Sequence, residues 1–302
     1  MTGNTIHQPA AVPKNVHPAM RVVMALIGDR LALCGLIMLA IFVLLALLAP
    51  VLSPQNPYDL MQLDIMDGRL VPGSSSMAGM TYWLGTDDQG RDLFSAILYG
   101  TRISLIVGFS SAVLALLIGA SLGLISAYVG GKTDATIMRI VDIQLSFPPI
   151  LIALILLAVL GQGVDKIIMA LVVTQWAYYA RTIRGSALVE RRRSYVDAAR
   201  SMALSNRRIL FRHILPNCLA PLIVVATMRI AYAIMLEATL SFLGIGLPVT
   251  EPSLGLLISN GFEYLMSGDY WISFFPGLTL LLLIVAINLV GDALRDILNP
   301  RN

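Results

Sequence analysis

The chain has 302 residues, of which 57% are hydrophobic and 13% are charged, and its formal net charge is +3. A soluble globular domain usually has about 25% charged residues, so these charges are too few to cover a water-soluble fold of this length. The composition excludes a soluble enzyme and a disordered chain, and the small net charge gives no indication of a nucleic-acid partner. An all-α protein that crosses a membrane several times is predicted.

Uncharged runs locate the predicted spans, because about 20 consecutive apolar residues cross the hydrocarbon core as a helix. The first run is longer than the roughly 7–15 residues of a signal-peptide core, so it is expected to remain as an uncleaved helix. The fourth run reaches full length only if Lys166 and Arg181 extend their side chains to the two interfaces. After an N-terminal tail over 1–30, a transmembrane domain over 31–302 is expected, with six spans at about 31–52, 103–128, 141–163, 166–182, 214–236 and 271–291.

The distribution of Lys and Arg predicts the orientation of these spans. With the N-terminus in the cytoplasm, 16 of the 21 basic residues fall in cytoplasmic segments, most of them near the loop over 183–213. Only four fall outside, where the long loop over 53–102 lies. Because cytoplasmic loops are the ones enriched in Lys and Arg, both termini are expected in the cytoplasm.

Charged residues gather just before the second predicted span. Asp87, Asp88, Arg91 and Asp92 lie around Gly90 in the external loop. One interpretation is a solvated turn whose Asp side chains cap the next helix. The other is an external gate or scaffold, formed by Asp87, Gly90, Arg91 and Asp92, that touches a binding protein.

Small residues and prolines mark two places inside the spans. Gly119 and Gly123 form a GxxxG pattern in the second span, which favours close packing of helices in lipid, with pore lining as the alternative. Pro148 and Pro149 lie in the third span, where prolines free backbone carbonyls and kink a helix.

The segment 181–216 is the most unusual of the cytoplasmic segments. Nine Arg residues face only two acidic residues between 181 and 212. Ala198, Ala199, Met202 and Ala203 recur at helical spacing, which predicts short helices at the membrane surface with one small apolar face. An anchor to anionic lipid and a docking element for a cytoplasmic protein are both consistent with this pattern.

Three polar residues in or near the last two spans are candidates for a translocation path. Arg229 and Glu237 lie about 12 Å apart along one helix, which is too far for a direct contact, and Asn288 lies in the last span. Charged groups in lipid cost several kcal/mol and therefore face protein or a water-filled cavity. A path and a structural pairing both remain open for these residues.

The cytoplasmic loop contains three groups at a fixed spacing, which are Asp197-Ala198-Ala199, Ala203 and Leu215-Pro216. This pattern resembles the EAA loop of ABC importer permeases, in which Glu-Ala-Ala is followed by Gly and then by Ile-x-Leu-Pro. Asp197 stands in place of Glu and keeps the negative charge that a helix start favours, and His213 stands in place of Ile. Ala203 stands in place of Gly and lacks its freedom to adopt positive φ, which argues against a glycine-type bend there.

Further segments resemble the C-type permease subunits of dipeptide, oligopeptide and nickel importers. Residues 84–92, LGTDDQGRD, resemble the LGTDxxGRD box before the second span, and residues 237–244, EATLSFLG, resemble the EAxLSFLGxG segment. The FPG at 275–277, the NLVGDALRD at 288–296 and Asn299-Pro300 resemble the family's C-terminal pattern. The ordered matches run from about 83 to 301.

The resemblance implies a type I ABC importer fold and ATP-driven import by alternating access in a bacterial inner membrane. The implied partners are a second homologous permease, two cytoplasmic ATPases that bind ATP and Mg, an extracytoplasmic solute-binding protein and membrane lipid. No cofactor or metal is expected in this chain. The residues expected to couple it to the ATPases are Asp197, Ala198, Ala199, Ala203, Leu204, Ser205, Leu215 and Pro216.

The sequence also bears on an enzyme, on other substrates, on a secondary transporter and on a membrane anchor as alternatives. The chain is not expected to be an enzyme, because Gly130-Gly131-Lys132-Thr133 lacks the first glycine of a phosphate-binding loop and follows a span instead of a strand. Peptides are the expected substrate, with nickel or glutathione import by the same architecture as the alternative. An ion-coupled secondary transporter would show inverted repeats, and a structural membrane anchor would not need a long basic loop.

Overall fold

The computed structural model describes residues 18–59, 63–76 and 79–298. The first part of the predicted N-terminal tail, over 1–17, lies outside the described residues. So do Asn299 and Pro300 at the end of the C-terminal motif.

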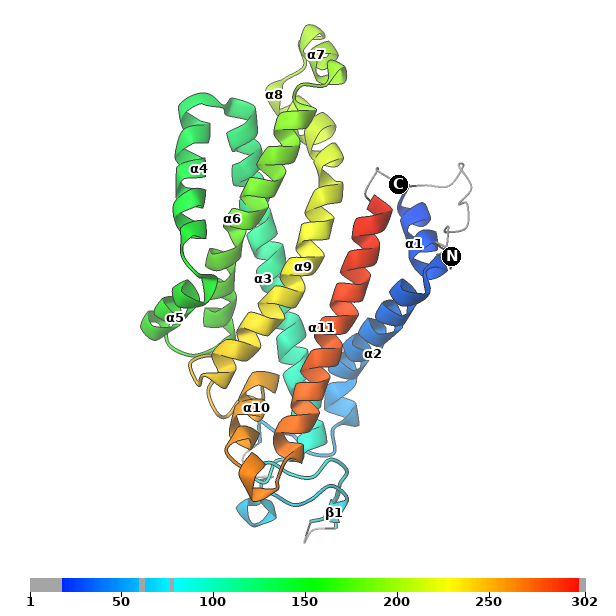
Figure 1. The fold of residues 1–302 in the computed structure, drawn as a ribbon, viewed down its shortest axis with the longest axis vertical. Helices are drawn as coiled ribbons and strands as arrows, with labels where there is room; N and C mark the ends of the chain where they lie inside the picture. The colour runs from blue at the N-terminus through cyan, green and yellow to red at the C-terminus, as the bar shows by residue number, and fades with distance from the viewer. Residues whose placement is uncertain (1–17, 60–62, 77–78, 299–302) are drawn as a thin grey trace, which may run out of the picture.

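Within the described residues, the protein is a bundle of long helices joined by short ones (Figure 1). One end of the bundle bears α7 and the opposite end bears β1 (Ser74–Ser75), which pairs antiparallel with β2 (Thr81–Tyr82). Single turns of 3₁₀-helix lie at Ile65–Asp67 and Leu265–Ser267, and a turn of π-helix lies at Ile209–Ile214. The helices are α1 (Pro18–Gly28), α2 (Arg30–Leu52), α3 (Leu93–Val129), α4 (Gly131–Ser146), α5 (Pro149–Leu160), α6 (Val164–Glu190), α7 (Ser194–Ser201), α8 (Asn206–Arg208), α9 (Leu215–Phe242), α10 (Leu254–Phe262) and α11 (Trp271–Leu298).

Four helical segments of the described chain are long and apolar enough to span a membrane, namely α2, α3, the continuous segment Asn206–Phe242 and α11. The bent pair of α4 and α5 makes a fifth if the two helices form one span. The predicted span over 166–182 lies in α6, which has 27 residues but has polar groups such as Thr174 and Gln175 at its middle. Both side chains are buried, so these polar groups of α6 face other parts of the protein and not lipid.

The predicted tail over 1–30 is partly helical. Residues of α1 pack against the end of α11, and Leu26, Ala32 and Ala293 form a shared apolar cluster. The chain bends between α1 and α2 at Asp29, whose side chain accepts a hydrogen bond from the backbone N–H of Leu31 at 2.9 Å and so caps α2. The sequence did not indicate this helix, because the charged residues Arg21, Asp29 and Arg30 interrupt the apolar residues around it.

The second span begins earlier than predicted. α3 starts at Leu93 and not at 103, so the loop before it ends at 92. Arg102, which set the predicted boundary, lies exposed on the surface of α3, where a long side chain does not interrupt the helix.

The GxxxG residues of α3 pack against α6, as the packing interpretation predicted. A Cβ atom at Gly119 would lie 2.2 Å from the backbone oxygen of Trp176, and one at Gly123 would lie 2.2 Å from that of Ala180. Only glycine permits this approach of two helix backbones. α3 and α6 accordingly form the centre of the bundle.

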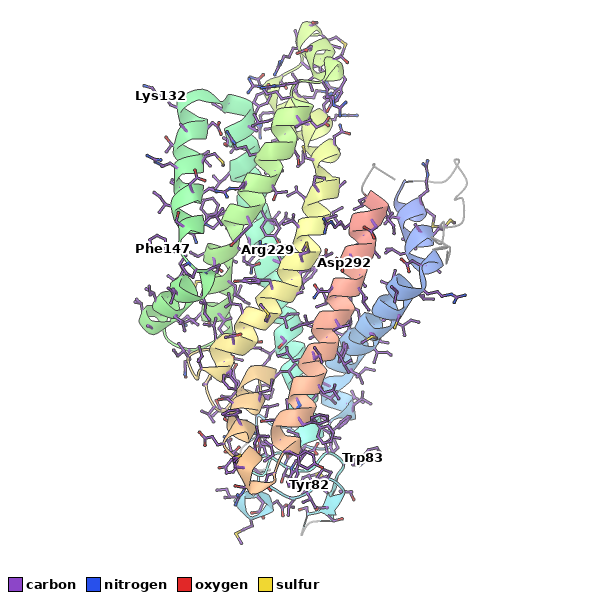
Figure 2. The ribbon with its side chains drawn as sticks, viewed as in Figure 1. Tyr82, Trp83, Lys132, Phe147, Arg229 and Asp292 are labelled. Carbon is purple, nitrogen blue, oxygen red and sulfur yellow. The ribbon has the colours of Figure 1, made fainter. Side chains whose placement is uncertain are left out.

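The prolines of the third predicted span break it into two helices. α4 and α5 meet at an angle of 90°, next to Phe147 (Figure 2). Pro148 precedes α5 and Pro149 is its first residue, where the missing N–H costs no helical hydrogen bond. The kink is confirmed, and the bent pair stays a candidate for the predicted span over 141–163.

The last two predicted spans are longer than expected, and a short helix separates them. α9 continues to Phe242 instead of 236, and α11 continues to Leu298 instead of 291. α10, which the sequence analysis did not predict, packs between α9 and α11. Gly255 fixes its position, because a Cβ there would lie 2.1 Å from the backbone oxygen of Ala238 in α9.

Candidate functional site

The charged residues before α3 form a buried network and not a solvated turn. Arg91 Nε donates to Asp87 Oδ2 at 2.6 Å, and the two side chains are 1% and 0% exposed. Asp87 also accepts from the backbone N–H groups of Gln89 and Arg91, both at 2.9 Å. Arg91 Nη1 donates to the backbone oxygen of Val249 at 3.1 Å, which joins this loop to the α9–α10 connection.

Asp92 caps α3, as one of the two interpretations proposed. Its Oδ2 accepts from the backbone N–H and the hydroxyl of Ser95, at 2.8 and 2.5 Å. Burial raises the pKa of Asp92, although the hydrogen bonds from Ser95 act in the opposite direction. Only glycine fits at position 90, for two reasons. Gly90 has a φ of +75°, and a Cβ there would lie 2.1 Å from the backbone oxygen of Asp64.

A third buried acid in this loop module, over 63–92, could not be identified from the sequence. Asp67 Oδ2 accepts from the hydroxyl of Tyr82 at 2.9 Å and from that of Ser76 at 2.7 Å, and the Asp67 backbone oxygen accepts from Thr86 Oγ1 at 2.6 Å. Tyr82 lies at the end of the molecule opposite α7, and the neighbouring Trp83 side chain is 74% exposed (Figure 2). No local sequence pattern distinguishes Asp67 from a solvated acid.

The predicted coupling residues lie on and after α7. Ala198, Met202 and Ala203 are exposed, as are Asp197 and Ser205. Ala199 differs from the other small residues. It is 1% exposed and packs with Val196 in the apolar cluster that includes Ile209 and Ile214. The single small face predicted from Ala198, Ala199, Met202 and Ala203 is therefore wrong, because Ala199 lies on the inward side of the helix.

The bend at Ala203 is present although the residue is not glycine. Ala203 has a φ of 55°, in the left-handed region that costs a residue with a Cβ about 1–2 kcal/mol. Its N–H donates to the Arg200 backbone oxygen at 2.9 Å, and the N–H of Leu204 donates to that of Ala199 at 3.2 Å. The expectation that alanine at position 203 would prevent a glycine-type bend is therefore wrong.

Hydrogen bonds attach the α7 region to the bundle. Tyr195 OH donates to Glu190 Oε2 at 2.7 Å, and Asn217 Nδ2 donates to the His213 backbone oxygen at 2.7 Å and to Tyr195 OH at 3.2 Å. Leu215 is half-buried and Pro216 is exposed at the start of α9. Leu215 and Pro216, the last predicted coupling residues, thus lie where the α7 region joins α9 and not at its exposed tip.

The three candidate path residues are not brought together. Glu237 is completely buried and accepts from the hydroxyls of Ser104, Ser241 and Ser253, each at 2.9 Å. Asn288 is exposed on α11. Arg229, labelled near the middle of α9 in Figure 2, is half-buried against the rings of tyrosines. In the described chain, no hydrogen bond or ion pair joins any two of the three.

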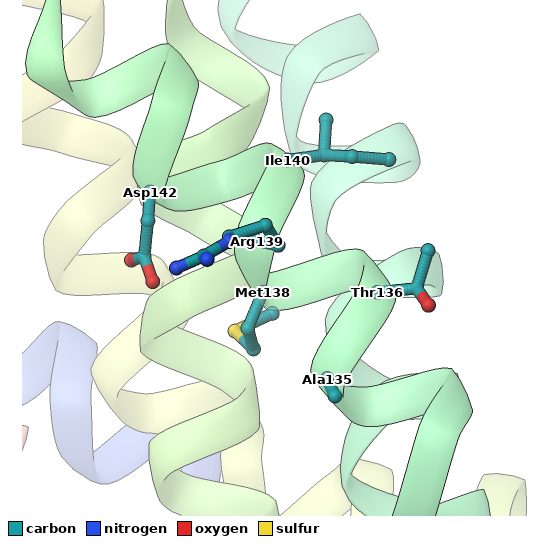
Figure 3. Close-up of a pocket in the computed structure, with 6 residues that line it drawn as sticks. All are labelled: Ala135, Thr136, Met138, Arg139, Ile140 and Asp142. Carbon is teal, nitrogen blue, oxygen red and sulfur yellow. The ribbon is translucent and has the colours of Figure 1, made fainter.

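A hollow lies along α4, lined by Ala135, Thr136, Met138, Arg139, Ile140 and Asp142. It has a volume of about 560 Å³ and is open to the outside; Figure 3 shows Arg139 and Asp142 on its lining. Asp142 is already paired with Arg181. Across the described ranges, no group of three His, Cys, Asp or Glu side chains is arranged to hold a metal.

Comparison with solved structures shows the class of fold. A structure described as inward-facing conformations of the MetNI methionine ABC transporter matches with a TM-score of 0.56, covering 68% of this chain and 96% of that chain at 22% identity. Together with the four or five candidate spans of the described residues, this likeness defines an all-α, multi-pass membrane fold of the kind found in that structure.

The particular family follows from sequence comparison. The family model "Binding-protein-dependent transport system inner membrane component" matches residues 119–302, and "N-terminal TM domain of oligopeptide transport permease C" matches residues 19–72. The dipeptide transport system permease protein DppC of Haemophilus influenzae is 40% identical, over 90% of this chain and 91% of that protein. The oligopeptide transport system permease protein OppC of Bacillus subtilis is 37% identical, over 91% and 87%. The chain belongs to the family of binding-protein-dependent inner-membrane permeases, a family without an ATPase site of its own.

Proposed function

We propose that this chain is one of two permease subunits of an importer for dipeptides or oligopeptides in a bacterial inner membrane. Relatives named as dipeptide and oligopeptide permeases match almost the whole chain, which supports this substrate class over nickel or glutathione. Two ATPases that bind ATP and Mg would drive alternating access from the cytoplasm. A solute-binding protein would deliver peptide from outside, and six spans would place both termini in the cytoplasm.

The observation that carries the proposal is the exposed tip of the α7 region. Ala198 and Ala203 are small exposed residues at the end of the α7 region, beside the exposed Met202, while Val196 and Ala199 attach it to the bundle. A partner can approach a surface of small side chains closely, and a push on a rigidly attached helix is transmitted to α9. The tip thus suits an ATPase cleft.

Replacing Ala198 by tryptophan tests this assignment. Because Ala198 is exposed, the bulky ring should leave the fold intact but obstruct docking, and ATP-driven uptake of a labelled dipeptide into proteoliposomes is expected to fall at least about tenfold, the loss of roughly 1.4 kcal/mol of docking free energy. Ala40→Trp, at an exposed position of α2, is the matched control. Equal uptake by the two variants contradicts the docking role of the α7 region. Uptake of nickel chelate or glutathione, but not of dipeptide, by the wild-type complex contradicts the proposed substrate class.

The proposed orientation predicts opposite labelling of the two ends of the bundle. Cysteine introduced at Ser205, beside α7, is expected to react with a membrane-impermeant maleimide only from the cytoplasmic side. Cysteine at Ser75, in β1, is expected to react only from the outside. Both residues are exposed in the structure, so the reagent distinguishes sidedness and not burial. The reverse pattern in right-side-out vesicles would refute the orientation.

A further inference from the structure

Arg229 places a permanent positive charge at the middle of a membrane-spanning helix. It lies halfway along α9 (Leu215–Phe242), about 20 Å from either end at 1.5 Å per residue. The hydrocarbon core is about 30 Å thick, so an arginine side chain at its centre cannot reach either interface by extending. A charge at this depth must be compensated where it lies.

Aromatic rings from two helices surround the guanidinium. Its Cζ atom lies 3.5 Å from the ring centroid of Tyr178 in α6 and 5.4 Å from that of Tyr232, one turn further along α9. Ring faces attract a cation, and they do so more strongly when water is excluded. They do not, however, satisfy the five N–H groups of a guanidinium as hydrogen-bond acceptors.

The described residues do not supply an anion for this charge. No ion pair or hydrogen bond of Arg229 occurs among them, in contrast to Arg91, Arg181 and Arg184, which each pair with an aspartate. Glu237, on the same helix, is about 12 Å away along the axis and is engaged by three serines. Arg229 is half-buried, so one side of its guanidinium remains accessible.

The helix surface next to this charge contains further polar groups without partners. Gln175 lies one turn before Tyr178 and Tyr179 on α6, and it is fully buried, as is Tyr179. Neither polar atom of the Gln175 amide, nor the hydroxyl of Tyr179, has a hydrogen-bond partner in the described part of the chain. Buried polar groups without a partner are unusual in native structures, so this part of α6 is more polar than a helix that only packs.

We propose that Arg229, Tyr178 and Tyr232 form a site at the membrane midplane that binds the carboxylate of the transported solute. The inference rests on the proposed function: for a peptide, the ligand group is the C-terminal carboxylate. A guanidinium binds a carboxylate through two parallel hydrogen bonds. The two tyrosine rings would hold the guanidinium in place for this contact. Lipid phosphates lie about 15 Å away at the interfaces, so a lipid headgroup does not reach it. Transporter substrate sites lie at this depth.

The test compares transport of a dipeptide with transport of its C-terminal amide. Wild-type and variant complexes, each with both permeases and both ATPases, are reconstituted in proteoliposomes and supplied with binding protein whose occupancy by each peptide is measured separately. Uptake is expressed per occupied binding protein, which removes discrimination by the binding protein. Arg229→Gln is expected to reduce uptake of the free acid about 10- to 100-fold, the effect of losing a charge-assisted hydrogen-bonded pair, and to leave uptake of the amide within about twofold.

Two matched variants separate recognition from folding. Tyr178→Leu removes the ring face and is expected to lose about three- to tenfold of the uptake of the free acid, as the cation–π contribution predicts, whereas Tyr178→Phe keeps the ring face and is expected to lose less than Tyr178→Leu. Binding-protein-stimulated ATPase activity confirms that each complex is assembled.

Two outcomes would overturn the inferred carboxylate site, and a third would overturn the proposed import of peptides on which the inference rests. Equal uptake of free acid by Arg229→Gln and wild type overturns the site. An equal loss for acid and amide also overturns it and indicates that Arg229 pairs with a carboxylate of the second permease. If the wild-type complex imports neither peptide, the proposed function fails instead.

Discussion

Replacing Arg91 by methionine is expected to destabilise the protein by about 3–5 kcal/mol, because it leaves Asp87 as an unpaired buried carboxylate. The pair is completely enclosed, with exposed fractions of 1% and 0% and an N···O distance of 2.6 Å. The variant also loses the hydrogen bond from Arg91 to the Val249 backbone oxygen, so the loop module over 63–92 should detach from the α9–α10 connection. Thermal unfolding of the purified protein in detergent measures the loss.

Two controls identify the buried charge as the cause. The double variant Asp87→Asn with Arg91→Met removes both charges and should regain part of the stability, since the cost of one unpaired ion disappears. Arg69→Met removes an arginine of the same module whose partner Asp269 is 3.6 Å away and whose own side chain is 50% exposed, and it should cost less than about 1 kcal/mol. A similar loss for Arg69→Met and Arg91→Met would contradict this account.

The sequence predicted the features that depend on counting charges and on short motifs. The apolar runs at α2, α3, α9 and α11 are long and contain few charges, so lipid is the solvent that fits them, and the structure confirms these as candidate spans. Pro148 and Pro149 change the backbone chemistry itself, so the kink between α4 and α5 could be predicted without a structure. Gly119 and Gly123 predicted the contact of α3 with another helix.

The sequence could not predict which polar residues are buried. Asp87 and Arg91 look the same in sequence whether they lie in water or are enclosed by Val249, which is 158 positions away from Arg91. Ala199 and Ala203 both look like parts of one small face, but the direction of α7 on the bundle places one inside and leaves the other exposed. These facts depend on long-range packing, which helical periodicity does not contain.

For Glu237 the sequence left a path and a structural pairing both open, and the structure changes what its replacement should do. As a path residue it would face a water-filled cavity, but its carboxylate instead connects three elements through Ser104 of α3, Ser241 of α9 and Ser253, which directly precedes α10. We infer that this carboxylate holds α10 in place against α3 and α9. The close contact of Gly255 with Ala238 lies immediately beside it.

Replacing Glu237 by leucine is therefore expected to destabilise the protein by about 3–9 kcal/mol, because three buried hydroxyl groups lose their acceptor at about 1–3 kcal/mol each. Glu237→Gln should cost about 1 kcal/mol, since the amide oxygen still accepts from Ser241 and Ser253 and the Ser104 hydroxyl can rotate to accept from the amide N–H. Thermal unfolding in detergent, with limited proteolysis of the segment over 243–253, measures both effects. Glu263→Leu, at an exposed acid after α10, is the control and should change neither measurement.

The glutamine variant also decides between the two roles of Glu237. If the carboxylate serves only to position α10, a folded Glu237→Gln complex should import dipeptide at close to the wild-type rate, because the hydrogen bonds are kept and only the charge is removed. If the carboxylate faced the transported solute, the same variant would be stable but would lose transport, since the charge itself would be needed. The burial of Glu237 at 0% exposure, with both carboxylate oxygens already engaged, favours the first result.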